Sequence, residues 1–208
     1  MNFVKAYKDF ITEDQKNILN QWTLDNYKTD YFMDPRMDSN GLRNTKLTTR
    51  FANPLINYNN PLIDPDKHDH INFIASSNPN FNYPDLVYNI QKSIVLTFGL
   101  KDFGLSPVGK DGIITEISFK GGTVHPHTDP VWFEGTHTVH CNLITQKPES
   151  GGVTYIQGEP WDINETDLLT YIVSSAEHSV DEVVGDKHRI LWVFSFMLSE
   201  FDTQRMFT

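Results

Sequence analysis

Residues 119–130 read FKGGTVHPHTDP, and they contain the most informative motif of this 208-residue chain. At the centre is His127-Thr128-Asp129, which puts an imidazole and a carboxylate two residues apart. In an extended chain, side chains at positions i and i+2 point to the same face. His127 and Asp129 are therefore predicted to bind one metal ion together, and imidazole plus carboxylate is a ligand pair that divalent iron accepts.

A third ligand has to come from another strand, and His178 is the strongest candidate. It lies in the segment SSAEHSVDEVVGDKHRILWVFSF, residues 174–196. Two neutral imidazoles and one carboxylate leave coordination positions open for reacting molecules. The competing histidines are His137, His140 and His188.

Arg189 opens an apolar, strand-like segment. A buried cation needs an anion, and a guanidinium fork suits a carboxylate, so Arg189 is predicted to bind an acidic ligand. Strand alternation places Leu191 and Val193 on its face, with Trp192 and Phe194 on the other. The alternative is a salt bridge to an acidic neighbour such as Asp181, Glu182 or Asp186.

The order of the two histidines, the aspartate and the arginine resembles the iron- and 2-oxoglutarate-dependent oxygenases. The resemblance covers about residues 113–198. Two branches of that family compete. Segment 119–129 looks like the prolyl hydroxylases, whereas His140-Cys141-Asn142-Leu143 looks more like the aspartyl/asparaginyl hydroxylases.

The resemblance implies a role for each residue of the set. His127, Asp129 and His178 are expected to hold Fe(II) and to form the catalytic centre. Arg189 is expected to bind the far carboxylate of the cosubstrate 2-oxoglutarate, while dioxygen takes the last metal position. His140 is expected to bind the cosubstrate or to lie beside the metal, and the alternative is a hydrogen-bonded core histidine.

The expected function is that of an Fe(II)- and 2-oxoglutarate-dependent dioxygenase. It would hydroxylate a peptidyl or free amino-acid side chain or a small metabolite. Trp132 and Phe133 lie where such a substrate could pack, or where a lid could pack on itself. Two other classes stay open: a cupin-like metalloenzyme that does not use 2-oxoglutarate, and a non-enzymatic metal-binding module.

The composition narrows the list of partners. Seventeen basic and 27 acidic residues give a net charge of −10, which argues against general nucleic-acid binding. No apolar run approaches the roughly 18–20 residues of a membrane span. Cys141 is the only cysteine, which suits a reducing cytoplasm. We therefore expect a cytoplasmic protein without a membrane or nucleic-acid partner.

Two helices are predicted in the first half of the chain. Thr12 and Gln15 have the spacing of a capping box, and an apolar stripe follows to about Tyr27. Pro84 and Gly99 bracket a second stripe with helical spacing.

Residues 30–82 are rich in Asn, Asp and Pro, which favours turns. Short strands are possible near 47–51 and 71–74. The triplet His68-Asp69-His70 has metal-like spacing, but we interpret it as part of a charged turn because no apolar flank or partner ligand adjoins it.

From Gly112 onward the pattern becomes strand-like, with Val, Ile, Thr and aromatic residues. The predicted strands are 113–120, 136–145, 152–157, 167–173 and 188–198. No helical pattern intervenes, so antiparallel pairing in a sandwich or barrel is expected. The fold class is mainly β with flanking helices, and the resemblance implies a double-stranded β-helix of the jelly-roll or cupin-like kind. We expect a single domain over 1–208, with helical and loop-rich support over about 1–110 and the β-helix core over about 111–200.

Overall fold

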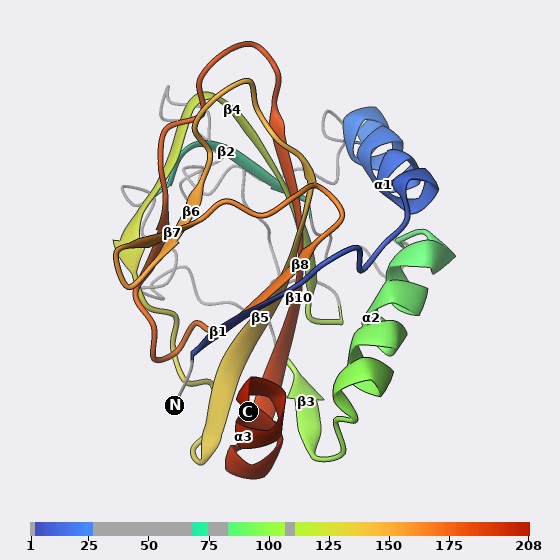
Figure 1. Ribbon diagram of the computed structural model, residues 1–208, viewed down its shortest axis with the longest axis vertical. Helices are drawn as coiled ribbons and strands as arrows, with labels where there is room; N and C mark the ends of the chain where they lie inside the picture. The colour runs from blue at the N-terminus through green and yellow to red at the C-terminus, as the bar shows by residue number, and fades with distance from the viewer. Residues whose placement is uncertain (1–2, 27–67, 75–82, 107–110) are drawn as a thin grey trace, which may run out of the picture.

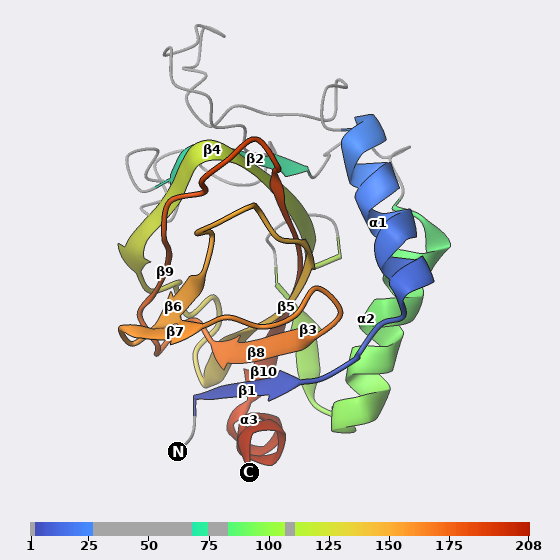
Figure 2. The same cartoon turned by 45° about the horizontal axis from the view of Figure 1, so that its top comes forward.

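The computed structural model describes residues 3–26, 68–74, 83–106 and 111–208. Within these ranges strands dominate, and all the strand pairs are antiparallel. Figure 2 shows that the sheet curls into a barrel, with two helices along one outer side. The prediction of antiparallel pairing in a barrel-like sheet is confirmed.

The strands follow one another around the barrel in the order β1-β8-β5-β10-β4-β9-β6-β7, with β2 beside β4 and β3 beside β10. Their bounds are β1 Val4–Tyr7, β2 His68–Ile74, β3 Phe103–Leu105, β4 Ile113–His127, β5 Thr136–Gln146, β6 Thr154–Ile156, β7 Glu159–Trp161, β8 Leu168–Ile172, β9 His178–Val180 and β10 Arg189–Ser199. The first part of β4 pairs with β10 and its last part with β9, so this one strand joins two regions of the barrel wall.

The two faces of the sheet bury different side chains. Trp192 and Phe194 point to the outer face, where they pack in one core with residues of the helices. Leu191 and Val193 point to the interior of the barrel and pack in a second core. The alternation predicted along β10 is confirmed, and Arg189 shares the interior face with Leu191 and Val193 because positions two apart in a strand point the same way.

The helices are α1 Glu13–Asn26, α2 Asp85–Phe98 and α3 Glu200–Phe207. The predicted capping box forms, because the backbone N–H of Gln15 donates to Thr12 Oγ1 at 3.2 Å and the backbone N–H of Thr12 donates to Gln15 Oε1 at 2.9 Å. Gly99 ends α2 in the left-handed conformation with φ of 58°. Figure 1 shows α1 and α2 on the same side of the sheet. Both predicted helices are confirmed, whereas α3 was not predicted.

Several expectations need correction. Residues 68–70 belong to β2 and are not part of a turn, and β2 also contains the strand predicted at 71–74. The strand predicted near 47–51 lies outside the described residues. The N-terminal part of the chain also adds β1 to the barrel, a strand that was not predicted. Among the described residues, no helix has the length and apolar character needed to cross a membrane.

Candidate metal centre

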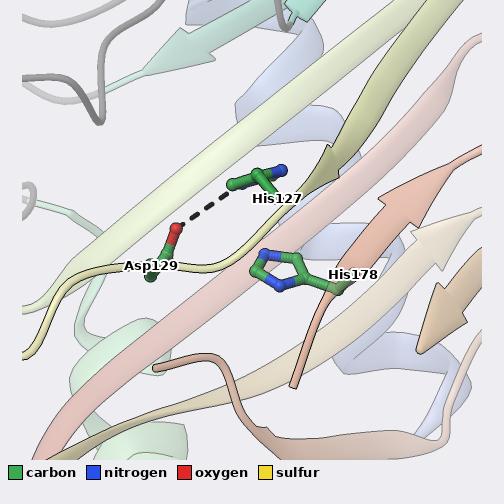
Figure 3. A group of neighbouring side chains, drawn as sticks. All are labelled: His127, Asp129 and His178. Atoms are coloured by element: carbon green, nitrogen blue, oxygen red, sulfur yellow. Dashed lines mark ion pairs between the residues drawn. The ribbon is translucent and has the colours of Figure 1, made fainter. Parts of the chain in front are cut away.

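Three side chains that could bind a metal meet where β4 and β9 run side by side. His127 ends β4 and lies opposite His178 of β9. Asp129 follows two residues after β4, and its backbone N–H donates to the carbonyl of Val173 at 2.9 Å. One ligand atom from each of His127, Asp129 and His178 lies within 4.8 Å of the others. Figure 3 shows Asp129 facing His127, with the ring of His178 nearby.

Hydrogen bonds to backbone carbonyls orient the imidazole rings of His127 and His178. The Nδ1 atom of His127 lies 2.8 Å from the carbonyl oxygen of His125, and Nδ1 of His178 lies 3.2 Å from the carbonyl oxygen of Ala176. A carbonyl can only accept, so each Nδ1 carries the proton and each Nε2 keeps its lone pair. Metal-binding histidines are oriented in this way by their second nitrogen.

Burial favours the neutral imidazole at His178 and His140, and the neighbouring histidines favour the charged form of Asp129. Burial lowers the pKa of His178 to about 4, although Asp129 opposes that shift. Burial raises the pKa of Asp129, but the contact from His127 and the charges of His140 and His178 outweigh it, so its pKa lies well below the usual range. Neutral imidazole and ionised carboxylate are the forms that bind a metal.

His140 on β5 holds the far side of the aspartate. The Nε2 atom of His140 lies 3.4 Å from Asp129 Oδ2, whereas Oδ1 faces His127 Nε2 at 3.5 Å. Burial lowers the pKa of His140, and Asp129 partly offsets this. The structure thus places His140 beside the candidate metal site, while its predicted contact with a cosubstrate stays a prediction.

Tyr171 on β8 connects this cluster with the deeper interior. Its ring lies 5.3 Å from the ring of His178, measured between centroids. Burial raises the pKa of Tyr171, which also responds to the charges of Asp129, Arg189 and Glu116. Asn142 Nδ2 donates to the Tyr171 hydroxyl oxygen at 3.0 Å. The phenol therefore stays protonated, and its own O–H proton is available to another acceptor.

Arg189 is fully buried, and three of its nitrogen atoms have acceptors. Nε donates to the carbonyl of Gly152 at 2.9 Å, one amino group donates to Glu116 Oε1 at 2.8 Å, and the other donates to Thr154 Oγ1 at 3.3 Å. Of the described residues, Arg189 is the only buried lysine or arginine. Its acidic partner is Glu116, so none of the nearby acidic residues named as alternatives is the one that pairs with it.

The other two competing histidines, His137 and His188, lie outside this cluster. His137 pairs with Glu200 of α3 at 2.8 Å, and His188 packs edge-on against Phe119. Of the two aromatic residues that follow the metal motif, Phe133 is 58% exposed and Trp132 is half-buried, and their contact with a substrate stays a prediction.

Four residues of this interior were not predicted from the sequence: Glu116, Gly152, Thr154 and Tyr171. Only Glu116 had a visible signal, because it is the one charged residue in the apolar run IITEISF at 113–119. Gly152 and Thr154 accept hydrogen bonds from Arg189 of β10, which is distant in sequence, so no local pattern predicts these contacts.

Comparison with known proteins gives structural matches only. No protein-family model matches the chain, and neither does any curated protein. A viral collagen prolyl hydroxylase from Paramecium bursaria Chlorella virus-1, solved with 2-oxoglutarate, matches with a TM-score of 0.59 at 8% identity, over 94% of this chain and 96% of that one. The chain has the same fold as this prolyl hydroxylase.

Two further structures show the same fold. A Pseudomonas putida prolyl-4-hydroxylase matches with a TM-score of 0.55 at 13% identity, over 96% of this chain and 94% of that one. HygX from Streptomyces hygroscopicus, solved with nickel and 2-oxoglutarate, matches with a TM-score of 0.59 at 8% identity, over 96% and 84%. The predicted fold class, a mainly β jelly roll with flanking helices, is confirmed.

Proposed function

We propose that this protein is an Fe(II)- and 2-oxoglutarate-dependent dioxygenase that hydroxylates a peptidyl or free amino-acid side chain or a small metabolite. The observation that carries the proposal is the meeting of His127, Asp129 and His178 within 4.8 Å in an oxygenase fold. Relatives in fold were solved with 2-oxoglutarate, and one of them with nickel as well.

The three side chains fit a divalent iron ion. Two neutral imidazoles and one carboxylate are the ligand set of non-haem iron oxygenases, and they leave open positions on the metal. Both Nε2 atoms are free of hydrogen, because the Nδ1 atoms lie at backbone carbonyls. His140, on the Oδ2 side of Asp129, would keep Oδ1 turned toward the metal.

The interior of the barrel also offers donors for a dicarboxylate. A guanidinium has five N–H groups, and three of those on Arg189 have acceptors in the described part of the chain. One N–H on each amino group therefore remains, and Tyr171 adds its O–H proton. These groups would bind the far carboxylate of 2-oxoglutarate.

When bound, iron and 2-oxoglutarate supply the oxidising chemistry, in which dioxygen hydroxylates the substrate and the 2-oxo acid is decarboxylated to succinate. The chain supplies binding and geometry. Leu191 and Val193 line the apolar interior and exclude water from the deep end of the site. Phe133 and Trp132 would contact the substrate, since both follow Asp129 closely and Phe133 is exposed.

One observation favours the second candidate, a cupin-like metalloenzyme that does not use 2-oxoglutarate. Arg189 already has a carboxylate partner, Glu116, so its burial does not by itself require an external anion. Binding of 2-oxoglutarate separates the two functions, because the second candidate needs the metal but not the cosubstrate.

The test is a pair of titrations without oxygen, followed by one turnover assay. Wild-type protein is titrated with Fe(II), and the loaded protein with 2-oxoglutarate. Succinate is then measured after oxygen is admitted. We expect one metal and one 2-oxoglutarate per chain, and succinate only when both are present. Metal binding without any 2-oxoglutarate binding would leave the cupin-like candidate in place.

We also propose that the protein works in the cytoplasm. The single cysteine, Cys141, is a buried free thiol, which is the usual state in a reducing compartment. Localisation of a tagged chain in its own cells would test this, and recovery outside the cytoplasm would contradict it.

A further inference from the structure

Glu116 is a buried carboxylate inside the barrel that the metal centre does not use. It lies opposite Leu191 across β4 and β10, on the interior face, and is only 4% exposed. Its Oε1 atom accepts from an amino group of Arg189 at 2.8 Å and from Ser118 Oγ at 2.8 Å. The chain therefore supplies its own anion to the guanidinium that is proposed to bind the far carboxylate of a cosubstrate.

Two anions at one guanidinium compete. Arg189 makes its remaining contacts with neutral acceptors, the Gly152 carbonyl and Thr154 Oγ1, so Glu116 alone neutralises its charge. A second carboxylate on the free N–H groups would share an amino group with Glu116. Like charges this close, in a site shielded from water, repel strongly.

We propose that Glu116 is a specificity-determining residue of the cosubstrate site, and this inference rests on the proposed function. By neutralising Arg189, Glu116 lowers the affinity for 2-oxo acids that carry a second carboxylate. Glu116 thereby makes the affinity for 2-oxoglutarate more similar to the affinity for 2-oxo acids that carry only one carboxylate. When a bound dianion leaves, the Glu116 carboxylate again neutralises the guanidinium of Arg189, which favours release of the dianion.

Removal of the Glu116 charge should strengthen the binding of 2-oxoglutarate. In Glu116→Gln the amide still accepts a hydrogen bond from Arg189, but the negative charge is gone. The guanidinium then lacks a counterion until a dicarboxylate binds. Affinity for 2-oxoglutarate should rise by about tenfold or more, since a close like-charge contact is removed and a charge pair is completed. Affinity for 2-oxopentanoate, which has the same chain length without the second carboxylate, should not change.

The experiment is calorimetric titration of Mn(II)-loaded protein with 2-oxoglutarate and with 2-oxopentanoate. Wild type and Glu116→Gln are compared with the control Glu165→Gln. Glu165 is also ion-paired, but with Lys16 and Lys187 at the surface. The substitution Glu165→Gln therefore removes one negative charge outside the barrel. We expect tighter 2-oxoglutarate binding in Glu116→Gln only, with 2-oxopentanoate bound equally by all three proteins.

The other outcomes are decisive too. Equal or weaker 2-oxoglutarate binding in Glu116→Gln would overturn the inference, and weaker binding would show that Glu116 only positions Arg189. If Glu116→Gln does not fold, Glu116→Thr replaces it, since threonine suits a strand and keeps an acceptor oxygen. Failure of both variants to fold would assign Glu116 to structure alone and overturn the inference. If metal-loaded wild type and variants all fail to bind 2-oxoglutarate, the proposed function fails instead.

Discussion

Asp129 divides its two carboxylate oxygens between His127 and His140. It is the only anionic member of the candidate ligand set, so Asp129→Ala should lower metal affinity by more than about tenfold. The matched control is His137→Gln, which changes a histidine that pairs with Glu200 outside the cluster. Metal analysis after dialysis measures both variants. Full metal occupancy in Asp129→Ala would contradict the ligand assignment.

Arg189 and Glu116 should depend on each other for stability. Arg189→Met leaves Glu116 as a buried, unpaired carboxylate, and breaking such a pair costs about 3–5 kcal/mol of unfolding free energy. The double variant Arg189→Met with Glu116→Leu removes both charges and should regain most of that loss, because apolar residues replace buried pairs well. Urea unfolding of the wild type, both single variants and the double variant measures this. If the losses of unfolding free energy in the two single variants add up in the double variant, the two side chains do not interact.

At the scale of elements, the turn before β6 is tied to β10. Gly152 has φ of +66°, and a Cβ atom there would lie 2.9 Å from Pro148 Cγ and 3.0 Å from Arg189 Cδ. Gly152→Ala should therefore cost about 1–2 kcal/mol for its backbone conformation and more for the overlap, and it should weaken 2-oxoglutarate binding by shifting Arg189. Gly158→Ala is the control, since Gly158 has φ of +80° with no atom within 4 Å of the added carbon. Thermal unfolding and 2-oxoglutarate titration compare the two variants. Equal losses of stability and of affinity in both would contradict the role of the overlap.

The elements were predictable where their own residues signal them. The capping box of α1, the stripe of α2 and the alternation of β10 are local patterns, and each produced the element it predicts. The three-residue strand β9 was missed because it is too short to show a period, although it carries His178. The pairing of Arg189 with Glu116 joins residues 73 positions apart. This pair can be predicted only if β10 is known to lie beside β4, and no local sequence pattern indicates that pairing.

For the whole molecule, the buried His178 makes the stability of metal-free protein depend on pH. Burial lowers its pKa to about 4, whereas an unfolded histidine has a pKa of about 6.5. Between these values the unfolded chain binds more protons, so stability is greatest above about pH 6.5 and falls as the pH drops toward 4. The loss amounts to about 3 kcal/mol from this residue.

Urea unfolding from pH 7 to pH 4 in the presence of a chelator measures this dependence. His178→Gln cannot take up the proton, so its stability should fall less over the same range. The same slope in wild type and variant would show that His178 is not the group responsible.

The pairing of β1 with β8 has a consequence for how a newly made chain matures. Thr170 Oγ1 donates to the carbonyl of Lys5 across 165 residues. A ribosome adds about 5–20 residues per second, so β1 emerges roughly ten seconds or more before its partner strand. His178, Arg189 and β10 emerge later still. The barrel wall at β1 therefore stays open while the intervening residues are made, and it can close only after β8 has emerged.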